Sequence, residues 1–214
     1  MGRIPFSLYD FFGYLASGSL LLASIAHVLD LDPLRQSPSP AAAVLLLFLA
    51  YVVGQALASP AAWLLERWLV GRLIGSPSDY LLLTRPTLKL FPAYSAPLPR
   101  KVRERVLAQL EAAGLSDDNA SAFLLGFAAA KSHSPTWQRL QTFQALYGFA
   151  RNVSFSLLLV SIIMAFVREP LLALAAGVLA FILAGRYLKF YRLFGQEVLL
   201  EFVRGEQWNS KSST

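Results

Sequence analysis

The chain has 214 residues, a formal net charge of +6 and no cysteine. Hydrophobic residues make up 56% of it and charged residues 15%, and the mean hydropathy is +0.51. A soluble domain carries about 25% charged residues, so this composition indicates a membrane protein. The lack of cysteine excludes a disulfide framework, a thiolate nucleophile and a cysteine metal site. In a membrane protein, excess Lys and Arg indicate topology and contact with anionic lipid, so we expect no nucleic-acid partner.

Residues 1–75 are predicted to form an N-terminal hairpin of two membrane-spanning helices. The first apolar run, about 6–29, is longer than the apolar core of a signal peptide and precedes no small-residue cleavage site, so we expect a retained helix. The second run, about 41–65, contains Gln55 but no charge. Pro60 predicts a kink near the end of that second helix.

Residues 76–134 are predicted to form a cytosolic helical insertion. Five prolines punctuate residues 75–99, which we expect to be a loop lying on the protein or on the membrane. Arg100 to Ala113 has the pattern of an amphipathic helix, and Gly114 is a natural stop for it. A second short helix is expected from Asp117 to Ala130.

Residues 135–204 are predicted to form a second helical hairpin. Ser134-Pro135 is a helix start signal, with Ser as the cap and Pro at the first helical position. Two uncharged runs predict spans at about 149–167 and 171–190, separated by Arg168-Glu169-Pro170. Both helices are expected to extend beyond the bilayer, and residues 205–214 to form a polar, frayed tail. The expected fold is therefore an all-α membrane protein with four transmembrane helices.

The distribution of charge predicts the orientation of these spans. Residues 66–151 hold eleven Lys and Arg against six Asp and Glu, and the chain from Arg186 onward holds five against three. The two short loops between paired spans hold one Lys or Arg each. Because cytoplasmic segments carry the excess of Lys and Arg, both termini and the central insertion are expected in the cytoplasm of a multi-pass inner-membrane protein.

A set of polar residues is predicted at the cytoplasmic side of the spans. Polar groups at membrane depth are costly and tend to face one another. A gate or inner vestibule and a network that fixes helix order both remain open, and we favour the network. Asp10 is expected to pair with Arg151 or, failing that, with Arg186. The set comprises Asp10, Gln55, Arg151, Asn152 and Arg186.

Small residues recur at helical spacing on three of the runs. Such faces allow close contact between helix backbones in lipid. The face on the fourth run is expected to pack on the first or second helix, or on another copy of the chain. The candidate packing residues are Gly13 and Ser17, then Ala50, Gly54 and Ala58, then Ala173, Gly177, Ala180 and Ala184.

No constellation of catalytic, cofactor-binding or metal-binding residues is predicted. His27 and His133 lie on opposite sides of the expected membrane and cannot easily share a metal. The third run contains Ser154, Ser156 and Ser161 without a paired base, so we expect these hydroxyls to bond carbonyls of their own helix.

Three segments resemble small bacterial integral membrane proteins with a first helix of the YDFFGYL type. They are SLYDFFGYLASGSLLL, FLAYVVGQALASPAAWLLER and LYGFARNVSFSLLL. The resemblance covers most of the four runs and implies a bacterial inner-membrane setting, without implying an activity.

Three classes of function are compatible with these features. The favoured class is a non-enzymatic membrane interaction or effector module that self-associates or docks a membrane or cytosolic protein partner. An oligomeric pore, channel or transporter component is the first alternative, although no inverted repeat is detectable. A lipid-modifying membrane enzyme is the second.

Overall fold

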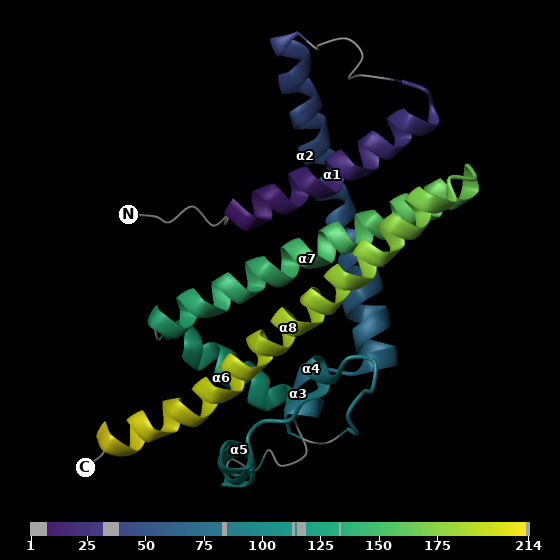
Figure 1. The fold of residues 1–214 in the computed structure, drawn as a ribbon. Helices are drawn as coiled ribbons and strands as arrows, with labels where there is room; N and C mark the ends of the chain where they lie inside the picture. The colour runs from purple at the N-terminus through teal and green to yellow at the C-terminus, as the bar shows by residue number, and fades with distance from the viewer. Residues whose placement is uncertain are drawn as a thin grey trace. The chain divides into compact units, whose positions relative to one another are not determined.

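The computed structural model describes residues 8–31, 39–82, 85–112, 114, 119–132 and 134–212, and every regular element in these ranges is a helix (Figure 1). Ala113, Asp117 and His133, which the predictions above name, lie outside them. The chain divides into two compact units. Unit 1 comprises Met1–Val70 and Ala145–Tyr187, and unit 2 comprises Gly71–Gln144 and Leu188–Thr214.

Unit 1 begins with two closely crossing helices, α1 (Leu8–Val28) and α2 (Pro40–Ala62) (Figure 1). A Cβ atom added to Gly18 would overlap the backbone carbonyl of Ala50, and one added to Gly54 would overlap the carbonyl of Tyr14. The crossing therefore requires glycine at both positions, because any side chain there would push the two backbones apart.

The second apolar run forms a longer helix than the expected span. α2 starts at Pro40 with Ser39 as its cap, whose hydroxyl accepts a 3.2 Å hydrogen bond from the Ala42 amide. After Ala62 the chain continues as a π-helical segment, η1 (Trp63–Ile74). Pro60 lies shortly before this change of hydrogen-bonding pattern and has no amide hydrogen to donate. A π-helical segment thus follows Pro60, and the kink expected there stays a prediction.

Two long helices, α7 (Ser134–Phe166) and α8 (Pro170–Ser212), form an antiparallel hairpin (Figure 1). They contribute Ala145–Phe166 and Pro170–Tyr187 to unit 1. The turn between them holds Arg168 at φ 63°, and the Glu169 amide bonds back to the Met164 carbonyl over 2.9 Å. This pattern is a Schellman motif with a residue other than glycine in the left-handed position.

Two expectations about this hairpin were wrong. The Ser154 hydroxyl donates to the Ala180 carbonyl at 2.8 Å and the Ser161 hydroxyl to the Ala173 carbonyl at 2.7 Å, so both bond across to α8 instead of to their own helix. Small residues on α8 bring its carbonyls within reach of α7. In addition, α8 remains helical to Ser212, past the expected frayed tail, since each added residue gains a backbone hydrogen bond.

Unit 1 buries several polar side chains and exposes many large apolar ones, the reverse of the usual arrangement in water. Its buried residues include Ser17, Ser24, Asn152, Ser154 and Ser156. Large apolar side chains stand outside instead, among them Val44, Leu45, Phe48, Phe166, Leu171 and Leu174. Four helices of the described chain are long and apolar enough to cross a membrane: Tyr9–Val28, Pro40–Leu81, Pro135–Phe166 and Pro170–Arg204. The sequence prediction of four long apolar helices is confirmed.

Unit 2 contains two short helices that the sequence prediction missed, α3 (Pro77–Leu81) and α4 (Pro92–Ser95). Both lie where a loop was expected. Ser76 and Asp79 form a reciprocal capping box at the start of α3, with Pro77 at the first helical position. Serine followed three residues later by an acid is a sequence signature of a helix start, and it was present in the chain.

Two tyrosines close the end of η1 within unit 2. The Tyr80 hydroxyl donates to the Ile74 carbonyl, and the Tyr94 hydroxyl donates to the Gly75 carbonyl at 2.7 Å. Burial raises the pKa of Tyr94, so its hydroxyl stays protonated and able to donate. These bonds satisfy carbonyls that a helix end leaves without a partner.

The remaining helices of unit 2 are α5 (Arg100–Ala112) and α6 (Asn119–Ser132), close to the two helices expected there. Gly114, at φ 69°, follows α5 as predicted. The apolar side of α5 is buried in a cluster with residues of α3, its neighbouring loop and α8: Leu81, Leu82, Leu98, Val106, Leu110, Leu199 and Phe202. The predicted extensions of α7 and α8 thus belong to unit 2.

Candidate functional site

An ion pair between α7 and η1 is the centre of the polar cluster in unit 1. The Arg151 guanidinium donates through Nη1 to Glu66 Oε1 and through Nε to Asn152 Oδ1, at 3.1 Å for the latter. The Arg151 side chain is 14% exposed and that of Glu66 is 30% exposed. Asn152 is buried. Arg151 therefore has both a carboxylate and an amide oxygen as acceptors in a mostly buried setting.

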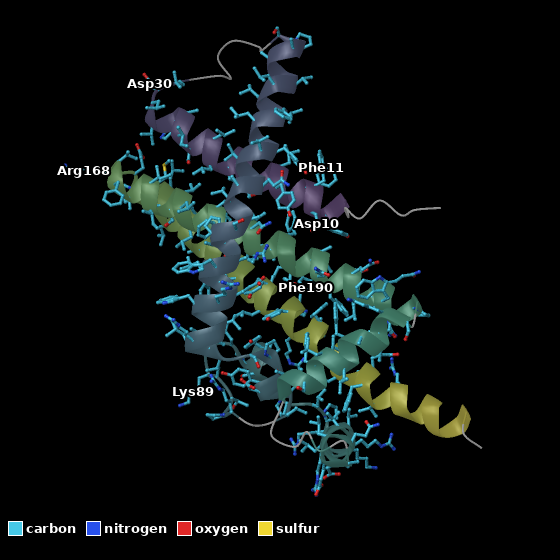
Figure 2. The ribbon with its side chains drawn as sticks, turned by 180° about the vertical axis from the view of Figure 1, so that it is seen from behind. Asp10, Phe11, Asp30, Lys89, Arg168 and Phe190 are labelled. Atoms are coloured by element: carbon cyan, nitrogen blue, oxygen red, sulfur yellow. The ribbon has the colours of Figure 1, made fainter. Side chains whose placement is uncertain are left out.

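The structure shows Arg151 and Asn152 of the predicted polar set bonded to each other. Arg151 and Asn152 form the cluster, whereas Gln55 and Arg186 are exposed. Asp10 lies near the start of α1 (Figure 2), with a carboxylate oxygen 3.8 Å from the position of a Cβ added to Gly148. Asp10 thus lies against α7, about one turn before Arg151. A pair between Asp10 and Arg151 stays a prediction, because the carboxylate seen to bond Arg151 is that of Glu66.

Glu66 is the member of this cluster that sequence reasoning missed. It was treated only as the end of the second run. The argument used for Asp10, an acid at the same membrane depth as Arg151, applies equally to Glu66. The choice between the two depends on how each helix is rotated about its axis, and the apolar runs do not define that rotation.

Several of the candidate packing residues lie at helix contacts within unit 1. Gly13 faces Phe149 of α7, while Ser17 is fully buried beside Gly54. Ala50 is buried at the α1–α2 crossing. Ala58 is partly buried.

On α8, Ala180 joins Ala176 in an apolar cluster with Val153 and Leu157 of α7. Ala16 and Leu20 of α1 pack against the same cluster. Gly177 lies near Ser161 of α7, Ala173 accepts a hydrogen bond from it, and Ala184 is partly buried. The small-residue face of α8 is therefore turned mainly toward its hairpin partner α7.

Four serine hydroxyls of unit 1 form hydrogen bonds within the unit. Ser17 bonds the Tyr14 carbonyl, Ser24 bonds the Leu21 carbonyl, and Ser154 and Ser161 bond α8. Ser156 is buried without a hydrogen bond in the described structure. These four hydroxyls thus join helices or satisfy nearby carbonyls.

In unit 2 a second charged cluster joins α7 to α8. Arg139 pairs with Glu197 at 3.0 Å, and the Thr136 hydroxyl donates to buried Glu201 at 3.0 Å. Arg204 lies 3.4 Å from Glu201 and 3.8 Å from Glu197. Because each carboxylate has a cationic partner, we interpret this cluster as a structural contact that holds α7 to α8.

Comparison with known proteins adds no relative to this description: no protein-family model, no curated protein and no solved structure matches the chain. The resemblance to small bacterial membrane proteins stays a prediction.

Proposed function

We propose that this chain is a non-enzymatic integral protein of the bacterial inner membrane, which acts as an interaction module. Four spans anchor it, both termini and unit 2 are cytoplasmic, and unit 2 docks a cytosolic partner. The observation that carries the proposal is that Arg151, Ser154 and Ser161 of α7 each bond a neighbouring helix.

The docking surface that we propose is the charged side of α5. Val106 and Leu110 are fully buried, so the apolar side of this helix is already covered by its own unit. Arg100, Lys101 and Arg105 are exposed, and Glu104 pairs with Arg100 at 2.7 Å. An amphipathic helix that binds a membrane by insertion would need its apolar side free. Exposed cations on a fixed helix instead suit an acidic protein surface.

The length of α8 supports a module with one part inside the bilayer and another part outside it, in the cytoplasm. Its 43 residues extend about 64 Å, whereas the hydrocarbon core is about 30 Å thick. A helix of this length cannot lie wholly within lipid. Its C-terminal part, which belongs to unit 2, is proposed to stand in the cytoplasm, in agreement with its basic charge.

The docking proposal is tested by exchanging the exposed charges of α5 in the full-length protein. We expect the variant Arg100→Gln/Lys101→Gln/Arg105→Gln to lose a cytosolic partner that the unaltered protein retains during purification from its own cells. The control variant Arg72→Gln/Lys189→Gln removes two exposed cations elsewhere in unit 2 and should retain it. Equal retention by both variants would contradict the proposed surface.

A flux measurement separates this proposal from an oligomeric pore. The purified protein in liposomes is expected to pass ions no faster than empty liposomes do, because Arg151, Ser154 and Ser161 bond neighbouring helices and are not free to line a pore. Sustained ion flux that scales with the amount of protein would reject the interaction module and favour the pore.

A further inference from the structure

The side-chain amide of Gln55 in α2 has no hydrogen-bond partner among the described residues, and the residue is exposed. It lies fifteen residues after Pro40 and eleven before Glu66, which correspond to about 22 Å and 16 Å along a helix. These lengths place Gln55 within a hydrocarbon core about 30 Å thick. An amide at that depth finds no water and is costly unless another protein group bonds it.

The residues around Gln55 form a regular exposed stripe, which we call the α2 seam. The seam comprises Leu45, Phe48, Val52, Gln55 and Ser59, spaced alternately three and four residues apart. Leu45 and Phe48 are 66% and 65% exposed, and the other three are also exposed. The α1 contact uses a different side of the helix, marked by buried Ala50, Gly54 and Ala61. The 3–4 spacing is the pattern by which two helices pack with a small left-handed crossing.

We propose that the α2 seam is the interface of a symmetric dimer, in which Gln55 of one copy hydrogen-bonds Gln55 of a second copy. Identical chains insert in the same orientation, so their α2 helices run parallel and bring equal positions to equal depth. A side-chain amide has both donor and acceptor groups, so two of them satisfy each other across a two-fold axis. One polar residue in an apolar seam also fixes the register of the two helices.

This inference rests on the proposed interaction module and names its partner within the membrane, a second copy of the chain. Lipid alone would satisfy the apolar members of the seam but could not bond the Gln55 amide. A partner of another kind would need a complementary polar group at the same depth, whereas a second copy supplies it by symmetry.

Cysteine cross-linking of the full-length protein in membrane vesicles tests the dimer directly, because the native chain has no cysteine. Val52→Cys and Ser59→Cys on the seam are expected to form disulfide-linked dimers after mild oxidation. Leu46→Cys is the control, since Leu46 is 44% exposed but about half a turn away from Gln55 around the helix. Equal cross-linking from all three variants, or none from the seam, would overturn the proposal.

The role of the amide is tested by Gln55→Leu, a change at an exposed position that should leave the monomer folded. We expect the dimer dissociation constant in detergent to rise about fivefold or more, as for the loss of an interhelical hydrogen bond. A change of less than about twofold in the dissociation constant would overturn the amide pairing. A Gln55→Leu variant that melts at a higher temperature, in a protein whose seam cysteines do not cross-link, would overturn it as well. Retention of the cytosolic partner is scored separately, so lost cross-links with intact docking reject only the dimer.

Discussion

Arg151 is the residue whose replacement should most disturb unit 1. Its guanidinium bonds Glu66 and Asn152 in a mostly buried setting. We expect Arg151→Gln to lower the free energy of unfolding in detergent by about 1.5–3 kcal/mol, the range for hydrogen bonds to charged groups. Adding Glu66→Gln should then cost little more, because the interaction has already been lost. Thermal melting of the two single variants and the double variant measures this coupling.

The exposed pair of Arg100 and Glu104 provides the control for that cycle. Their side chains are 84% and 54% exposed and lie four residues apart on α5. A solvated pair of this kind contributes only about 0.3–0.5 kcal/mol, so the same cycle should give a much smaller coupling energy. Similar coupling energies for the two pairs would show that Arg151 and Glu66 do not form the central contact of unit 1.

At the scale of single residues, sequence reasoning placed Arg151 and Asn152 in the polar cluster but missed Glu66. The charge pattern predicts which residues lie near the membrane surface, because apolar runs define depth. It does not predict which of two acids faces a given arginine, because that depends on helix rotation and on the π-helical geometry of η1. The exposure of Gln55 could not be predicted from the charge pattern either, because it depends on the same helix rotation.

At the scale of elements, the crossing of α1 and α2 depends on two glycines. A Cβ at Gly18 would meet the Ala50 backbone, which cannot move without separating the helices. Overpacking of this kind typically costs about 1–3 kcal/mol, so we expect Gly18→Ala to lower the melting temperature in detergent. Gly185 of α8 is the matched control, because a Cβ there meets nothing within 4 Å.

Gly185→Ala should be neutral or stabilising, by about 0.5–1 kcal/mol, since alanine is the better helix former. Melting curves of the two variants, measured in the same detergent, compare close contact with helix propensity directly. If Gly18→Ala proved as stable as Gly185→Ala, the two helices could not approach as closely as described.

Capping residues next to one another in the sequence predicted where several helices begin and end. The errors arose where such residues were overlooked or where a contact joins distant parts of the chain. Gly114 and the Ser134-Pro135 pair indicated the end of α5 and the start of α7, because cap chemistry is encoded in adjacent residues. The abundance of proline concealed α3, although its capping box was readable in the sequence. The cross-helix bonds of Ser154 and Ser161 were not predictable, since they depend on how closely α8 approaches α7.

At the scale of the whole molecule, the two units show different relations between composition and burial. Unit 1 buries several serines and exposes leucine and phenylalanine, whereas α5 of unit 2 buries Val106 and Leu110 and exposes arginine. Composition predicted both environments, because the apolar runs and the basic helix are separate in sequence. The unit boundaries within α7 and α8 were less accessible to prediction, since both helices pass through them without a break.

The proposed function depends most on four spans with unit 2 in the cytoplasm. The chain lacks cysteine, so single-cysteine variants report accessibility without a background. We predict that an impermeant thiol reagent added to intact cells labels Glu169→Cys, in the turn between α7 and α8. It should label Arg105→Cys, on the exposed side of α5, only after the cells are broken. Labelling of Arg105→Cys but not of Glu169→Cys in intact cells would contradict the orientation and, with it, the proposed cytosolic partner.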